Sequence, residues 1–197
     1  MPAGNDPSDM RAQADQILTQ MRAEKLDAIT PPRFRTAITL PALVEQALAD
    51  TTTPSLYLTG PVGAGKTHAA WAVIRRILEH DDLTHLATAL VAHRATTLLD
   101  LLRPSDDPTA ARREVTRCQH ARLLFLDDLG AEKPTEWTRE RLYEIVDHRY
   151  AELLPIVVTS NLPPSKLGDH VGERVASRLA EMCTVVPLII ADRRRPR

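Results

Sequence analysis

Gly60-Pro61-Val62-Gly63-Ala64-Gly65-Lys66-Thr67 is the stretch that decides the fold, because it fits the pattern G-x-x-x-x-G-K-[ST] of a phosphate-binding loop. In such a loop the glycines let the backbone turn tightly and point its N–H groups at phosphate oxygens. The lysine reaches the outer phosphates, and the last hydroxyl binds Mg²⁺. The sequence therefore predicts a nucleotide site with Mg²⁺, contacted by this stretch and by His68 directly after it.

The pattern is informative only with a strand before it and a helix after it. Residues 55–59 (SLYLT) predict the strand, and a helix is expected from the loop to about Glu79. Further strands are predicted at 86–91, 123–126, 155–159 and 185–190, with helices at 94–102, 109–119, 135–153 and 175–182. Apolar strands that alternate with helices are typical of a parallel sheet buried on both faces. The expected fold is therefore an α/β P-loop NTPase sandwich of three layers, with five parallel strands.

Two carboxylates follow the apolar run 123–126. Asp127 and Asp128 come at the carboxyl end of this predicted strand, where ligands of open parallel sheets bind. We expect Asp127 to share the Mg²⁺ with Thr67, and Asp128 to orient or deprotonate the attacking water. Without the phosphate loop, the same pair would read as a solvated turn.

Later polar residues allow two interpretations each. Asn161 follows the strand at 155–159 and could contact the γ-phosphate, although an Asn before Leu-Pro-Pro also favours a turn. Arg174 and Arg178 lie four residues apart on one helix face, either as solvated ion-pair partners or with an arginine offered to a neighbouring subunit. The final arginines, including Arg193 and Arg194, are either a basic tail or nucleotide contacts.

Composition excludes several classes of protein. The 197 residues carry 25 Lys and Arg against 26 Asp and Glu, a net charge of −1, so bulk charge does not hold this chain on nucleic acid or membrane. Two distant cysteines form no disulfide framework and at most half a zinc site. No apolar run is long enough for a membrane span, and residues 1–10 lack a signal-peptide pattern. We therefore expect a cytoplasmic protein.

The N-terminal part differs from the rest of the chain. Residues 8–26 predict a helix with an apolar stripe, and Pro31-Pro32 ends this region. We expect a short N-terminal extension and linker at 1–40 and a nucleotide-binding domain at 41–197. The stripe either binds a partner protein or packs on the main domain.

Seven motifs together resemble the DnaC/IstB-type AAA+ ATPases. They are ITPPRFRTA (29–37), GPVGAGKTH (60–68), LLFLDDLG (123–130), the pair Arg149-Tyr150, IVVTSNL (156–162), GERVASRL (172–179) and the ending Asp192-Arg193-Arg194. The phosphate loop occurs in many NTPases, whereas LDDLG, TSN and ERxxSRL in this order are much more specific. The resemblance covers the chain from about Ile29 to its end.

The resemblance implies roles that the residues alone leave open. Asn161 is similar to sensor 1, Arg178 to an arginine finger that acts on the next subunit, and Arg194 (or Arg193) to sensor 2. Proteins of this family bind ATP with Mg²⁺, form ATP-dependent homo-oligomers and touch single-stranded DNA. The chain stops at the last predicted strand, so we expect no full C-terminal helical lid.

The resemblance favours a replicative helicase loader that delivers a ring helicase to single-stranded DNA, with ATP as a slowly hydrolysed switch. The alternative is an IstB-like transposition helper whose partner is a transposase, because both share every ATP-site residue. A small-metabolite kinase is a third interpretation, but no acceptor-binding residues or lid arginine pair are visible. A fourth is a switch that binds ATP and barely hydrolyses it, which Asp128 in place of Glu leaves open.

Overall fold

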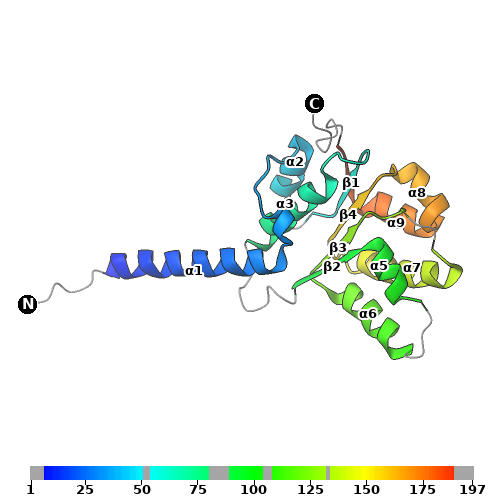
Figure 1. The fold of residues 1–197 in the computed structure, drawn as a ribbon, viewed down its shortest axis with the longest axis horizontal. Helices are drawn as coiled ribbons and strands as arrows, with labels where there is room; N and C mark the ends of the chain where they lie inside the picture. The colour runs from blue at the N-terminus through cyan, green and yellow to red at the C-terminus, as the bar shows by residue number, and fades with distance from the viewer. Residues whose placement is uncertain (1–6, 51–53, 80–88, 104–107, 132–133, 189–197) are drawn as a thin grey trace, which may run out of the picture.

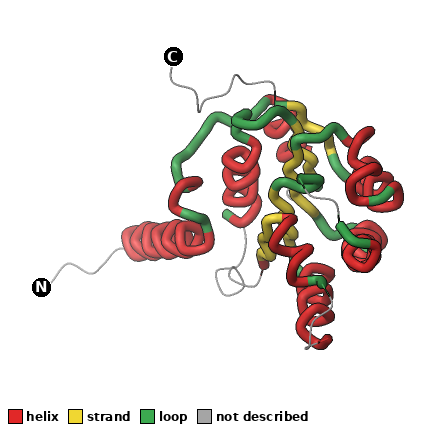
Figure 2. The backbone as a smooth tube through the Cα atoms, turned by 45° about the vertical axis from the view of Figure 1, so that its right-hand side comes forward, coloured by secondary structure: helices red, strands yellow, loops and turns green. Residues whose placement is uncertain are grey.

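The computed structural model describes residues 7–50, 54–79, 89–103, 108–131 and 134–188. In these residues a five-stranded parallel sheet separates two layers of helices (Figures 1 and 2). The strands are β1 (Leu56–Thr59), β2 (Leu90–Arg94), β3 (Leu123–Asp127), β4 (Ile156–Ser160) and β5 (Thr184–Pro187). The predicted α/β fold with five parallel strands is confirmed.

The strand order β2-β3-β4-β1-β5 positions the site. The first strand in sequence lies inside the sheet, between β4 and β5, and Thr59 pairs with Ser160 in the parallel register. Since parallel strands end at the same edge, the loop after β1 lies beside the residues that follow β3 and β4. Sequence segments about 60 and 100 residues apart therefore meet at one edge of the sheet.

One layer contains the helix that follows the phosphate loop. It consists of α2 (Ala42–Asp50), α3 (Lys66–Leu78), the 3₁₀ turn η1 (Pro32–Phe34) and the end of α1 (Pro7–Ile29). Side chains of α3 pack on the sheet, where the rings of Trp71 and Phe125 meet edge to face at 5.5 Å. Leu26 of α1 and Val44 of α2 are buried in the same cluster.

The other layer contains α5 (Ala95–Leu101), α6 (Pro108–His120), α7 (Glu136–Ala151), α8 (Pro164–Val171) and α9 (Glu173–Met182). The side chains of β3 alternate between the layers. Leu124 and Leu126 pack with this second layer, whereas Leu123 and Phe125 pack with the first. Both faces of the strand are thus apolar, which is why its sequence shows no alternation.

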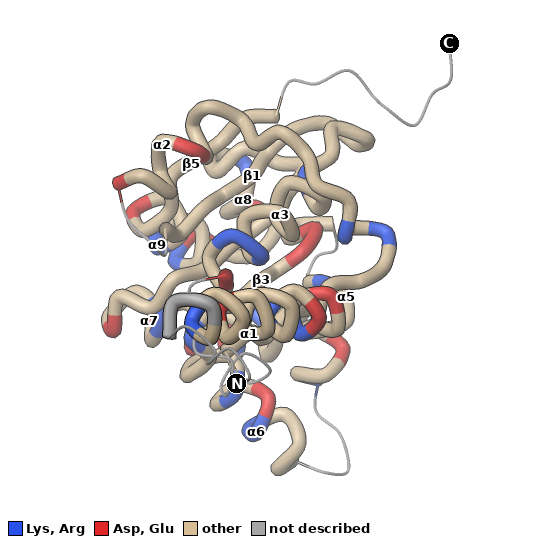
Figure 3. Tube along the Cα trace, turned by 90° about the vertical axis from the view of Figure 1, so that its left-hand side faces the viewer, with Lys and Arg blue, Asp and Glu red and all other residues tan. Residues whose placement is uncertain are grey.

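The N-terminal helix α1 extends away from the rest of the protein (Figure 1), and Figure 3 shows it nearly end-on. Its apolar stripe is exposed, with Met10, Ile17, Leu18 and Met21 each 44–57% accessible. Only its last turns are held, through buried Leu26 and an ion pair between Asp27 and Arg75. The interpretation in which the stripe packs on the main domain is therefore wrong.

Some predicted boundaries require correction. The strand expected at 86–91 runs from Leu90 to Arg94, and the following helix starts at Ala95; residues 86–88 lie outside the described part. β5 ends at Pro187, and the expected continuation at 189–190 is also outside it. The sequence reading missed α8, which begins at a proline, a favoured first helical residue. Among the described helices, none combines the length and apolarity of a membrane span.

Arg149 is fully buried and bonded to four backbone carbonyls. Its Nη1 donates to the carbonyl oxygens of Cys118 and Ala121, both at 2.8 Å, and of Gln119 at 3.1 Å, while Nη2 donates to Pro155. Burial lowers the pKa of Arg149 to about 10, which leaves the guanidinium charged at neutral pH. This one side chain therefore joins the end of α7 to the chain segments that enter β3 and β4.

We expect Arg149→Met to lower the free energy of unfolding by about 3 kcal/mol or more, because hydrogen bonds to a charged group contribute about 1.5–3 kcal/mol each and their buried carbonyls would lose a partner. Denaturant unfolding measures this change. The control is Arg139→Met on the same helix, where the ion pair to Glu136 is exposed and 3.9 Å long. Equal losses in the two variants would contradict the structural role of Arg149.

Candidate nucleotide-binding site

The loop 60–65 takes a backbone path that requires glycine at its ends. Gly65 has φ +86° directly before Lys66, the first residue of α3. Gly60 lies against the backbone of Leu188, and a Cβ there would collide with the Leu188 carbonyl oxygen. The N-terminus of α3 consequently opens onto the loop, and the first N–H groups of a helix, which have no acceptor within the helix itself, can bind an anion.

Lys66 is the central cation of the site. Its side chain is largely buried, and Nζ donates to the carbonyl oxygens of Gly60 and Pro61, both at 2.9 Å, and to Asn161 Oδ1 at 2.7 Å. The structure thus brings the predicted loop lysine and the predicted Asn161 into direct contact across 95 residues of sequence.

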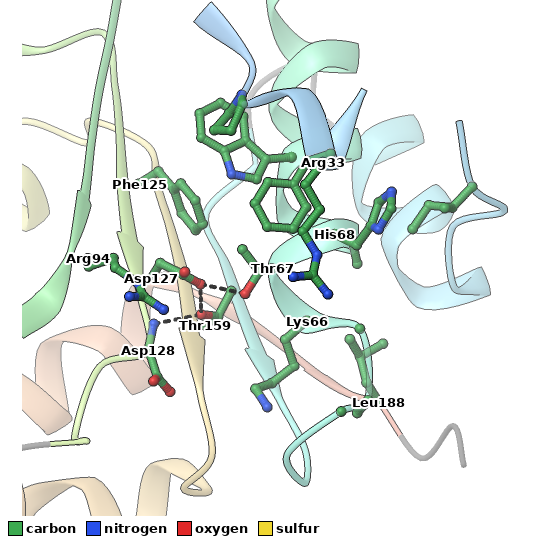
Figure 4. A pocket seen from close by; sticks show the side chains of 18 of the residues that line it. Arg33, Lys66, Thr67, His68, Arg94, Phe125, Asp127, Asp128, Thr159 and Leu188 are labelled. Atoms are coloured by element: carbon green, nitrogen blue, oxygen red, sulfur yellow. Dashed lines mark hydrogen bonds between the residues drawn. The ribbon is translucent and has the colours of Figure 1, made fainter. Parts of the chain in front are cut away.

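One carboxylate oxygen of Asp127 accepts hydrogen bonds from two hydroxyl groups. Thr67 Oγ1 donates to Asp127 Oδ1 at 2.8 Å, and Thr159 Oγ1 donates to the same atom at 2.7 Å (Figure 4). Three oxygen-bearing side chains from α3, β3 and β4 therefore meet at one point. The sequence singled out Thr67 and Asp127, but it gave Thr159 no role.

Asp128 stands in a strained backbone conformation, with φ +62°. Its N–H donates to Thr159 Oγ1 at 2.8 Å, and its Oδ1 accepts from Asn161 Nδ2 at 2.9 Å. A non-glycine residue rarely adopts this region, and such strain is characteristic of functional sites. The turn directs the Asp128 carboxylate toward Asn161, which also accepts from Lys66.

A cavity of about 870 Å³ contains all these groups. Phe34 and His68 form part of its wall, with ring centroids 5.6 Å apart, and Trp71 stacks on Phe34 at 6.5 Å. His68, expected as a contact, does line the cavity, whereas the aromatic wall before the loop was missed. Phe34 lies about 30 residues before the loop, so the spacing of the loop motif does not place it in the cavity.

Two further cationic side chains line the cavity, and the sequence did not single out either of them as a site residue. Arg33 comes from η1, and Arg94 ends β2 opposite Asp127 in the parallel register (Figure 4). Together with Lys66 they place three positive charges around two carboxylates. That balance suits a polyphosphate bound together with a divalent cation.

Arg178 lies outside this cavity. Its guanidinium stacks over the ring of Tyr150 at 4.2 Å, and its Nε donates to Asp147 Oδ1 at 3.0 Å. The hydrogen bond to Asp147 raises the pKa of Arg178. Arg174 stacks over Tyr143 instead, at 5.6 Å. Arg193 and Arg194 lie outside the described residues.

A second cluster was not foreseen. His93 Nε2 is 2.7 Å from Glu114 Oε1, and Cys118 Sγ is 3.6 Å from the same oxygen. Glu114 also pairs with Arg117 at 3.2 Å. Burial raises the pKa of Cys118 to about 12, so this thiol is protonated at neutral pH. The cluster is therefore paired within itself and joins α6 to β2.

Comparison with known proteins identifies the class of protein. Residues 38–189 match the family model "IstB-like ATP binding protein", and the chain belongs to this family. A relative at 28% identity over 116 residues is the replicative helicase loader DnaI of Bacillus subtilis, covering 58% of this chain and 35% of DnaI. Another, at 30% over 112 residues, is a putative ATP-binding protein in an insertion sequence of Mycobacterium tuberculosis, covering 56% of this chain and 42% of that protein.

Solved structures show the same fold. A crystal structure of DnaI superposes with a TM-score of 0.67 at 20% identity, covering 81% of this chain and 95% of that one. The replication initiator DnaA, bound to AMPPCP and single-stranded DNA, gives 0.62 at 21% identity, with 76% and 45% covered. The fold is therefore that of the P-loop AAA+ proteins. The chain spans about half or less of the length of the curated relatives described here.

We expect Thr159→Val to weaken ATP binding in the presence of Mg²⁺ by about tenfold, because Asp127 loses one of its two hydroxyl donors and the Asp128 N–H loses its acceptor. Isothermal titration measures the affinity. Ser160→Ala is the matched control, since it removes a buried hydroxyl from the same strand that donates to the Leu129 carbonyl and accepts from the Leu162 N–H, away from the two carboxylates. Equal effects on affinity would show that Thr159 has no specific role.

Lys66→Ala should reduce ATP affinity at least about 100-fold, because the loop loses its one buried cation. The far-UV circular dichroism spectrum should stay unchanged, since the hydrogen bonds of its Nζ to Gly60, Pro61 and Asn161 lie at the site and not in the apolar core. Lys166→Ala, at an exposed position of α8, serves as the control. Retained affinity in Lys66→Ala would contradict the assignment of the phosphate site.

Proposed function

We propose that this protein is an ATPase that loads a replicative ring helicase onto single-stranded DNA. The observation that carries the proposal is the meeting of Lys66, Asp127, Asp128 and Asn161 at one cavity, in a chain of an ATP-binding family. ATP would bind with its phosphates on the loop 60–65 and its base toward Phe34 and His68. Phosphate oxygens would replace the loop carbonyls as partners of Lys66.

The donor set at Asp127 fits Mg²⁺. Thr67 and Asp127 offer hydroxyl and carboxylate oxygens, the ligands that this hard cation prefers, and their oxygens already lie 2.8 Å apart. These two residues would hold the ion, and Thr159 would orient the carboxylate through its hydrogen bond. When bound, the cation neutralises charge on the β- and γ-phosphates.

Asp128 and Asn161 would act on the attacking water. The Asp128 carboxylate accepts its proton, and the Asn161 amide, bonded to both Asp128 and Lys66, orients the water against the γ-phosphate. An aspartate is one methylene shorter than glutamate, so we propose slow turnover. Arg178 would complete the site from a neighbouring copy of the chain, because it is not part of its own cavity.

The exposed stripe of α1 supports a protein partner. Four large apolar side chains on one face of a projecting helix are suited to the apolar surface of another protein. We propose that residues 1–40 bind the ring helicase, that 41–197 form the ATPase domain, and that this domain contacts single-stranded DNA. The named helicase loader among the relatives favours this partner.

An ATP-dependent transposition helper is the second candidate. The matching family model and the insertion-sequence relatives favour it. Its ATP site would work in the same way, and a transposase would take the place of the helicase. The two functions therefore differ in the partner and not in the chemistry.

An assay of how the purified host helicase is loaded onto DNA decides between the two candidate functions. We expect the protein with ATP to bind this helicase and to speed its loading onto circular single-stranded DNA. Ile17→Asp should reduce binding at least about tenfold by placing a charge within the buried apolar contact. Gln16→Asp, on the opposite face of α1, is the matched control and should bind normally. Binding to transposase and not to helicase would replace the first candidate by the second.

A further inference from the structure

The motif Arg149-Tyr150 sends its two side chains in different directions. Arg149 is buried at the sheet, as described above, whereas Tyr150 lies at the surface between α7 and α9. The Tyr150 ring lies under the Arg178 guanidinium at 4.2 Å, and its hydroxyl donates to Glu181 Oε2 at 2.7 Å. The tyrosine therefore contacts both the candidate arginine finger and a carboxylate one helical turn beyond it.

Asp147 provides a second contact to the same arginine. It lies one turn before Tyr150 on α7 and accepts from Arg178 Nε at 3.0 Å. Glu181 lies 3.9 Å from Arg178 Nη1, and Ser177 Oγ donates to its other oxygen at 3.2 Å. We call Asp147, Tyr150, Arg178 and Glu181 the arginine clamp.

The charges of the arginine clamp reinforce one another. The hydrogen bond to Asp147 raises the pKa of Arg178, and the bond from Tyr150 lowers the pKa of Glu181. The Glu181 carboxylate and the Arg178 guanidinium therefore stay ionised at neutral pH. Asp147 engages Nε and Glu181 lies beside Nη1, which leaves Nη2 as the nitrogen through which the guanidinium can bind an anion.

The contacts of the arginine clamp are too weak to be needed for the fold. Exposed ion pairs contribute about 0–1 kcal/mol, and exposed cation–π contacts about 0.5–1 kcal/mol. Their effect is to select one orientation of a long, flexible side chain. An arginine that is oriented beforehand loses less entropy when it meets a phosphate.

We propose that Asp147 and Tyr150 are positioning residues, which hold Arg178 in the orientation that reaches the ATP of a second copy of this chain. The inference rests on the proposed function, in which Arg178 acts across a subunit junction. It also gives the two halves of the Arg149-Tyr150 motif separate roles. Arg149 places α7 on the sheet, and Tyr150 uses that placement to orient the arginine.

Mixed assemblies test this role. A donor chain carries Lys66→Ala, so it cannot use its own ATP, and an acceptor chain carries Arg178→Ala, so it depends on the donor's arginine. Steady-state hydrolysis by the mixture reports only the acceptor pocket completed by the donor. We expect Asp147→Ala or Tyr150→Leu in the donor to lower kcat by about tenfold or more, out of the roughly 10³-fold that an arginine finger contributes.

Three comparisons show whether the substitutions act by releasing Arg178 from its orientation or by disturbing the fold in general. Tyr150→Phe in the donor keeps the ring under the guanidinium and should retain most of the rate. Arg139→Met in the donor is the control on the same helix and should retain all of it. Placed in the acceptor, Asp147→Ala and Tyr150→Leu have no Arg178 to orient, so the rate and the ATP affinity should not fall further.

The outcomes distinguish this inference from the proposed function. If the unmodified donor and acceptor show no more hydrolysis together than apart, the trans role of Arg178 is wrong. If they do cooperate, but the clamp substitutions in the donor leave kcat unchanged or lower it equally from the acceptor side, the proposed function stands and the positioning role is overturned.

Discussion

The buried guanidinium of Arg149 fixes the arrangement on which both the nucleotide cavity and the arginine clamp depend. Arg149 joins α7 to the backbone segments that lead into β3 and β4. A charge without water around it must keep its hydrogen bonds, so α7 has little freedom to shift. The strands that it joins carry Asp127 and Thr159 near their carboxyl ends, and the helix that it holds carries Asp147 and Tyr150. The cavity and the arginine clamp are therefore placed by the same contact.

Within the cavity, three hydrogen-bonded side chains connect the loop to the end of β3. Lys66 bonds Asn161, Asn161 bonds Asp128, and Asp128 bonds Thr159 through its backbone. A nucleotide that takes Lys66 away from Asn161 would alter the partners of Asp128 as well. Such a network would couple phosphate binding at Lys66 to the orientation of the Asp128 carboxylate. This property would suit the proposed use of ATP as a switch.

The sequence predicted the elements that depend on local patterns and missed those that depend on distant contacts. The phosphate loop, the acidic pair and the five strands follow from short motifs and apolar runs. Thr159 and Arg94 contribute to the cavity because the sheet brings them there, and Arg33 and Phe34 because η1 packs on α3. β2 was placed too early because its apolar run begins before Leu90, while its end at His93 and Arg94 is polar and resembles a loop. Arg149 gave no sign of burial, since arginine is usually exposed.

The weak attachment of α1 gives the protein two regions of different local stability. Only the last turns of this helix contact the rest of the protein, and a helix without packing partners is barely stable in water. Its amide hydrogens would exchange with solvent long before those of β3 and β4, whose exchange requires opening of the sheet. The projecting segment can therefore unwind and reform without disturbing the nucleotide pocket.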